Sequence, residues 1–136
     1  MDYSEYIPGV CNIGPAETAM RKRAGWAGAI VTAVLWGLFA SLRVKEVWYL
    51  LLFFPAASSA SGFIQARMHF CAAFGLKSLF NFGPEVGKTD TVLQAEFRAL
   101  DKKKAWRILG YSSSVGVLVA LVAYLLGTTF LSSPRL

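Results

Sequence analysis

The side chains best suited to metal or redox chemistry in this chain are Cys11, His69 and Cys71. Zinc and iron sites use thiolates and imidazoles of this kind. Their spacing matches no recognised metal motif, however, and on one helix His69 and Cys71 would point about 200° apart. Free cysteines more often pack as small hydrophobic side chains, and a disulfide between the two is disfavoured in a reducing cytoplasm. We therefore predict packing and no cofactor, with a metal site as the alternative.

A second candidate is a polar strip made of Gln65, Arg67 and His69, at the end of an apolar stretch. Ionisable side chains at membrane depth are functional candidates, and these three could contact a lipid, a quinone or a partner protein. The alternative is that Arg67 extends its head group to the membrane surface while His69 lies in the interface.

Five basic residues gather before the last apolar stretch: Arg98, Lys102, Lys103, Lys104 and Arg107. Near a membrane surface, each such residue contributes about 1 kcal/mol of attraction to anionic lipid. They predict lipid binding, although they could also serve only to fix the orientation of the chain. No nucleic-acid recognition motif accompanies them, so nucleic acid is not an expected partner.

Residues 83–89 read Gly-x-x-x-Gly-Lys-Thr, one residue short of a phosphate-binding loop. No strand is predicted before them, so 83–90 is predicted to be a plain loop. No carboxylate falls within the apolar stretches, and no serine or cysteine lies near an obvious base and orienting acid. Because the chain also has a single histidine, the sequence predicts that the protein is not an enzyme.

The elements that must position these residues are three apolar stretches, 24–42, 47–66 and 110–127. Each holds about 20 residues, enough for an α-helix to cross a hydrocarbon core of about 30 Å. A composition of 55% hydrophobic and 16% charged residues agrees with a membrane protein. The prediction is an all-α integral membrane protein, with three transmembrane helices in one domain over 24–127. An N-terminal tail covers 1–23, a cytoplasmic segment covers 67–109, and a C-terminal tail covers 128–136.

The segments that flank the spans also predict helices. Pro15 suits the first turn of a helix, which could run unbroken into the first span, while Pro55 can kink the second. Residues 91–109 have the pattern of an amphipathic helix that continues into the third span. Residues 68–82 are predicted to extend the second span into the interface or to form a short interfacial helix.

Small residues recur every four positions within the spans, which predicts faces where another helix backbone can approach closely. The first span carries the longest column of small residues. In the second span, the side chains that follow Pro55 are small on every face of the helix. The predicted packing residues are Gly25, Ala29, Ala33, Gly37 and Ser41 in the first span, Ser58 and Gly62 in the second, and Ser112, Gly116 and Ala120 in the third.

Lysine and arginine counts predict the orientation. The N-terminal flank and the segment 67–109 hold eleven basic residues, whereas the opposite side has only Arg43, Lys45 and Arg135. By the positive-inside bias, the N-terminus and the segment 67–109 face the cytoplasm and the C-terminus faces outside. The predicted location is a plasma or inner membrane.

These features favour a small accessory subunit of a larger membrane protein complex. It would pack against other integral membrane proteins through its small-residue faces and bind anionic lipid at its cytoplasmic face. Two alternatives remain open. One is a homo-oligomeric channel or carrier lined by serines of the second and third spans, and the other is a redox or cofactor-binding membrane protein that uses Cys11, His69 and Cys71.

Overall fold

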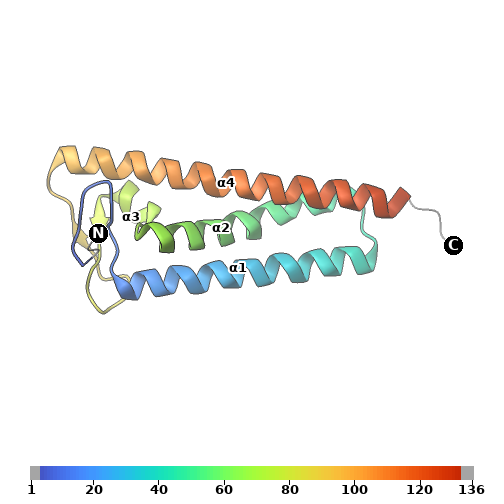
Figure 1. Cartoon of the computed structure of the whole chain (residues 1–136), viewed down its shortest axis with the longest axis horizontal. Helices are drawn as coiled ribbons and strands as arrows, with labels where there is room; N and C mark the ends of the chain where they lie inside the picture. The colour runs from blue at the N-terminus through green and yellow to red at the C-terminus, as the bar shows by residue number, and fades with distance from the viewer. Residues whose placement is uncertain (1–3, 133–136) are drawn as a thin grey trace.

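The computed structural model describes residues 4–132, and within them three long helical segments lie along one axis (Figure 1). They are α1 (Pro15–Leu42), the pair η1 (Glu46–Leu52) and α2 (Phe53–Met68), and α4 (Ala95–Ser132). Each of the three is long and apolar enough to cross a membrane. The predicted number and approximate positions of the apolar helices are therefore confirmed.

α1 begins and ends at local signals in the sequence. Gly14 precedes the helix, Pro15 occupies its first turn, and Glu17 lies near its positive end. The helix ends because Arg43 adopts a left-handed conformation (φ 48°) and donates its backbone N–H to the carbonyl of Ala40. The predicted unbroken helix from Pro15 through the first span is confirmed.

The second span changes helix type near its start. Residues of η1 form a 3-10 helix, and the α-helical conformation begins at Phe53. Pro55 lies in the first turn of α2, where a missing backbone N–H costs least. The helix therefore changes from 3-10 to α just before the proline that the sequence marks as a site for a kink.

α4 is one continuous helix of 38 residues, which confirms that the amphipathic segment runs into the third span. It begins at Ala95 and not near residue 91, because Asp90 and Thr91 form strand β2. Residues 128–132, predicted to belong to the C-terminal tail, continue α4. Residues 133–136, including Arg135, lie outside the described residues.

One end of the helices is covered by residues 4–14 and 69–94, and we call it the capped end (Figure 1). His69 is left-handed (φ 50°) and ends α2, after which the chain forms the short helix α3 (Ala72–Lys77). Of the two predictions for 68–82, an extension of α2 is wrong, and a short helix is found.

Short strands complete the capped end. Strands β1 (Leu79–Phe80) and β2 (Asp90–Thr91) pair antiparallel, with Leu79 opposite Thr91. Ile13 forms a parallel bridge to Asn81, which follows β1. The chain between the strands is a loop, as predicted for 83–89. The N-terminal tail and the segment 67–109, which the sequence predicts to lie on the same side of the membrane, therefore contact each other in the structure.

α2 lies between α1 and α4 and packs against both (Figure 1). One apolar core, around Phe70 and Ile108, fills the space between α2, α3 and α4 at the capped end. A second, around Tyr49, Leu52 and Ala123, lies at the opposite end. We call that end, formed by residues 43–52 and the last turns of α4, the open end.

Candidate functional site

α1 and α2 come into close contact near the capped end. A Cβ on Gly62 would lie 2.5 Å from the backbone nitrogen of Gly25, and a Cβ on Gly28 would lie 2.8 Å from that of Ser59. The Ser59 hydroxyl donates to the carbonyl of Gly25 at 2.8 Å. Gly25 and Gly62, two of the predicted packing residues, therefore lie at this contact. Buried Ser59 takes the role predicted for Ser58, which is exposed.

The rest of the predicted column on α1 leaves the contact. Ala29 is half-buried, whereas Ala33, Gly37 and Ser41 are exposed. The reason is helix geometry, because a step of four residues turns by about 400°, so the column drifts by about 40° at each step. The positions that stay against α2 and η1 follow steps of three and four residues: Gly25, Gly28, Thr32, Leu35 and Phe39.

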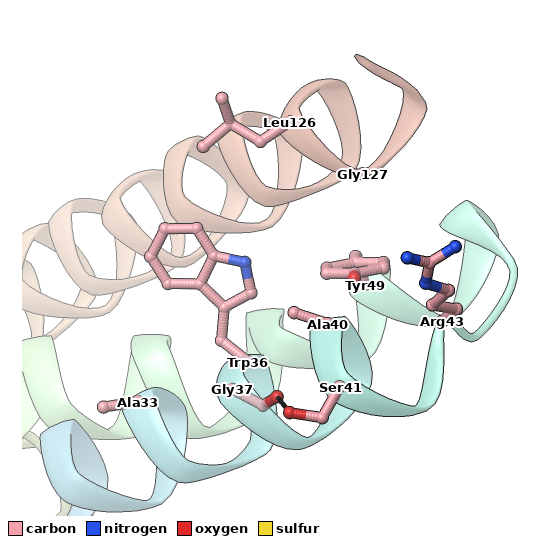
Figure 2. A pocket seen from close by; sticks show the side chains of 9 residues that line it. All are labelled: Ala33, Trp36, Gly37, Ala40, Ser41, Arg43, Tyr49, Leu126 and Gly127. Carbon is pink, nitrogen blue, oxygen red and sulfur yellow. Dashed lines mark hydrogen bonds between the residues drawn. The ribbon is translucent and has the colours of Figure 1, made fainter. Parts of the chain in front are cut away.

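The exposed part of the column lines a groove between α1 and α4 at the open end (Figure 2). This open-end groove has a volume of about 600 Å³. Gly37 lies on it, and a Cβ there would meet nothing within 4 Å. The Trp36 indole extends from α1 toward α4, and Arg43 lies beside Tyr49 at the mouth (Figure 2). The lining residues are Ala33, Trp36, Gly37, Ala40, Ser41, Arg43, Tyr49, Leu126 and Gly127.

The predicted packing residues of the third span all face inward. Ser112, Gly116 and Ala120 are buried, and a Cβ on Gly116 would lie 2.7 Å from the Ala57 side chain of α2. The same face continues toward the capped end through Ile108 and Ala105 to Asp101, each of which is fully buried. This face of α4 therefore changes from apolar to charged as it leaves the apolar span.

Asn12 joins the N-terminal segment to the turn after α2. Its side chain accepts a hydrogen bond from the backbone N–H of Cys71 (2.6 Å) and donates to the carbonyl of the same residue (3.0 Å). Its backbone donates to the carbonyl of His69 and accepts from the N–H of Asn81. Asn12 is fully buried, so its polar groups cannot bond to water and these hydrogen bonds satisfy them instead. The same bonds join two segments that are far apart in the sequence.

Glu17 and Arg21 extend this polar cluster along α1. The Glu17 carboxylate is 1% exposed, and its Oε1 accepts from the side chain of Asn81 (3.0 Å) and the N–H of Gly87 (2.6 Å). Its Oε2 lies 3.7 Å from Arg21 Nη2, which donates to Cys71 Sγ at 3.0 Å. Within the described chain, Glu17 Oε2 and Arg21 Nε are buried without a hydrogen bond.

Asp101 holds the N-terminal segment against the first turns of α4. Its carboxylate accepts from the Tyr6 hydroxyl and from the backbone N–H of Gly9, both at 2.7 Å. Lys104 donates to the carbonyl of Val10 and lies over the Phe70 ring. Burial and the bond to Asp101 raise the pKa of Tyr6 well above its usual range. The cap is thus attached to α4 by polar contacts.

Cys11 and Cys71 are free thiols, both fully buried in the capped end. Burial raises the pKa of each thiol, and for Cys71 this outweighs the nearby Arg21 charge, which acts in the opposite direction. A thiolate is the reactive form of cysteine. Both side chains therefore pack in the capped end, where Cys11 donates to the carbonyl of Glu5 and Cys71 accepts from Arg21.

The structure does not assemble the alternative metal site. Among residues 4–132, no group of three His, Cys, Asp or Glu side chains could hold a metal ion, and Cys11, His69 and Cys71 are therefore not brought together as ligands. The backbone carbonyl of His69 accepts from the N–H groups of Asn12 and Ile13. His69 contributes to the turn that ends α2 through its main chain.

The predicted polar strip is separated by the end of α2. Gln65 is buried, accepts from the N–H of Ala72 at 2.9 Å and donates to Ser61 at 2.6 Å. Arg67 is exposed, and His69 follows the helix in a left-handed conformation. The strip is wrong as one surface, because residues two apart on a helix point to different sides.

Four of the five predicted lipid-binding residues are exposed on α4: Arg98, Lys102, Lys103 and Arg107. Lys104 is the exception, because it is half-buried and bonded to the N-terminal segment. Sequence reasoning also missed Asn12, Glu17, Asn81 and Asp101. A signal for two of them was present, since Glu17 and Asp101 extend the packing faces of α1 and α4 by helical steps.

No protein-family model, curated protein or solved structure matches this chain. The geometry of the chain is therefore the basis for assigning a function. It offers a tightly bonded polar cap at one end and an unfilled groove of small and aromatic residues at the other.

Proposed function

We propose that this protein is a small accessory subunit of a larger membrane protein complex, and that its open-end groove receives a transmembrane helix of a partner protein. The observation that carries the proposal is the open space beside Gly37. The glycines at 25, 28, 62 and 116 each meet a neighbouring element closely, whereas a Cβ on Gly37 would meet nothing within 4 Å among the described residues.

The lining of the groove suits a helix better than a polar ligand. Ala33 and Gly37 leave room for a close backbone, while Trp36 and Leu126 supply apolar walls. Association of helices in a membrane depends on close van der Waals packing at such small residues, because lipid already satisfies apolar surface. The partner we propose therefore carries small residues on its own contacting face.

The charge distribution supports a cytoplasmic capped end. Of the eleven basic residues in the N-terminal flank and in 67–109, all but Arg21 and Lys104 are exposed. Such an excess of lysine and arginine is retained on the cytoplasmic side of plasma or inner membranes. In this arrangement Arg98, Lys102, Lys103 and Arg107 lie near the headgroups, where they would attract anionic lipid.

The test is to extract the protein in a mild detergent, measure the mass of the particle and identify co-purifying proteins. We expect a particle that contains other integral membrane proteins. The double variant Ala33→Leu, Gly37→Leu should fill the groove and lower their recovery by about fivefold or more, because an overfilled contact costs about 1–3 kcal/mol.

Gly110→Leu is the matched control, since Gly110 is a helical glycine that also has nothing within 4 Å of an added Cβ but lies outside the groove. It should leave the complex intact. Isolation of the wild-type protein as a lone monomer, or as a discrete homo-oligomer, would contradict the accessory role and, in the second case, favour the channel alternative.

A further inference from the structure

A second cavity lies nearer the capped end and differs from the open-end groove in its chemistry. This serine pocket has a volume of about 330 Å³ and receives residues from all three long helices. α1 contributes a cation, while α2 and α4 contribute hydroxyl and amide groups. The polar lining residues are Arg21, Ser58, Ser61, Gln65, Ser112 and Ser113, and no carboxylate of residues 4–132 is among the lining residues.

Arg21 enters the pocket with hydrogen-bonding capacity to spare. A guanidinium group has five N–H donors, and the described contacts of Arg21 are one bond to Cys71 Sγ, the 3.7 Å approach to Glu17, and the Phe74 ring against its face. Its Nε is buried and has no acceptor among the described residues. The donors that these contacts leave unused on its Nη atoms are available to an anionic acceptor in the pocket.

Two serine hydroxyls in the pocket lack a partner within the described residues. Serines in apolar helices commonly donate to the carbonyl four residues earlier, and Ser112 and Ser114 do so, to Ile108 and Gly110. Ser58 and Ser113 make no such bond although both line the pocket. Both are therefore hydroxyl donors among the residues that line the pocket together with Arg21.

We propose that the serine pocket binds a phosphate group, with Arg21 as the charged donor and Ser58 and Ser113 as hydroxyl donors. Arginine matches the geometry of phosphate oxygens and binds them with charge-assisted hydrogen bonds. The phosphate belongs to an anionic lipid headgroup or to a soluble phosphate compound. Trp26, Trp106 and Tyr111 are exposed near the pocket in sequence, and such rings mark headgroup depth in membrane proteins.

This site goes beyond the proposed accessory function, because it needs no partner protein. It also differs from the exposed basic residues of α4. Those residues attract any anionic surface by their charge alone, whereas the pocket combines a cation with fixed hydroxyl donors in a cavity. Binding there should therefore follow Arg21 and the two serines and should be insensitive to loss of exposed lysines.

The experiment uses native mass spectrometry of the full chain in detergent, titrated with dioleoyl phosphatidylglycerol and, as a phosphate-free lipid, dioleoylglycerol. We expect one phosphatidylglycerol per chain. Arg21→Gln should weaken its affinity by about tenfold or more, and Ser58→Ala, Ser113→Ala together by about threefold to tenfold. The control Lys102→Gln, Lys103→Gln removes two exposed charges and should change the affinity by less than about twofold.

Because Arg21 also contacts Glu17, the Arg21→Gln variant is first checked for unchanged thermal unfolding. If Arg21→Gln does not fold, the serine variant, which changes two exposed positions, tests the proposal instead. Displacement of the lipid by millimolar inorganic phosphate would show that the pocket also binds soluble phosphate. If the lipid stays bound in the presence of phosphate, the pocket is a lipid site. Equal binding of dioleoylglycerol and phosphatidylglycerol would overturn the proposal. So would wild-type affinity in the folded serine variant.

Discussion

The capped end and the open end of this molecule use the same small residues with opposite results. At the capped end, Gly25 and Gly62 bring two backbones into contact, and backbone hydrogen bonds join residues 12–14 to His69 and Asn81. At the open end, Gly37 leaves a groove unfilled. A small residue therefore permits a close contact but does not create one. The direction in which the residue faces on its helix decides whether another helix lies beside it.

The largest effect should come from adding volume at the α1–α2 contact. Gly62→Ala places a Cβ 2.5 Å from the backbone of Gly25, which no rotamer change can relieve. We expect a loss of about 3 kcal/mol in the free energy of unfolding, measured by reversible unfolding in SDS-containing mixed micelles. An unchanged midpoint would mean that the two helices are not in contact in solution.

The next effect should follow removal of the amide that connects the cap. Asn12→Ala leaves the buried backbone N–H of Cys71 without its acceptor, at a cost of about 1–3 kcal/mol. Hydrogen exchange should show faster exchange of the Cys71 amide, while amides of α1 beyond residue 30 keep their rates. Equal acceleration along the whole chain would contradict a bond that is local to the capped end.

The two ends should also differ in thiol reactivity. Cys11 and Cys71 are buried and their pKa values are raised, so both should react with N-ethylmaleimide at least about tenfold more slowly than Cys in a Ser41→Cys variant. Their rates should continue to rise with pH above about 8.5, the pKa of an unperturbed thiol. Equal rates for all three would show that the cap opens freely.

The smallest effect should have the opposite sign. Gly37→Ala adds a methyl group to a helix position with nothing within 4 Å, so the isolated protein should become more stable by about 0.5–1 kcal/mol. The same mixed-micelle measurement tests this, with Gly110→Ala as the matched variant. Destabilisation at Gly37 alone would mean that the groove is filled within a single chain.

The helices of this protein could be predicted from local patterns, because length and hydropathy define an apolar helix without knowledge of its neighbours. Pro15 indicated the start of α1, and the continuity of α4 was predicted from the lack of a breaker before Gly110. The faces by which the helices pack were harder to predict than the helices themselves. The four-residue column from Gly25 to Ser41 was treated as one face, although its drift carries Ser41 about 160° away from Gly25.

The polar cluster could be predicted only in part. Stepping back by four from Gly25 along α1 reaches Arg21 and Glu17, and stepping back from Ser112 along α4 reaches Ile108, Ala105 and Asp101. Their partners were not predictable in this way. Asn12 and Asn81 bond through main-chain geometry set by the left-handed turn at His69, and no local pattern indicates such a pairing between distant loops.

The bond from Tyr6 to Asp101 joins residues that are 95 positions apart, which has a consequence for synthesis. At about 5–20 residues per second, the N-terminal segment is made on the order of 5 to 20 seconds before its carboxylate partner exists. By that moment α1, η1 and α2 have been made, whereas most of α4, including its apolar span, has not. Tyr6 and Gly9 therefore cannot reach their final positions until α4 has begun to be made, long after their own synthesis.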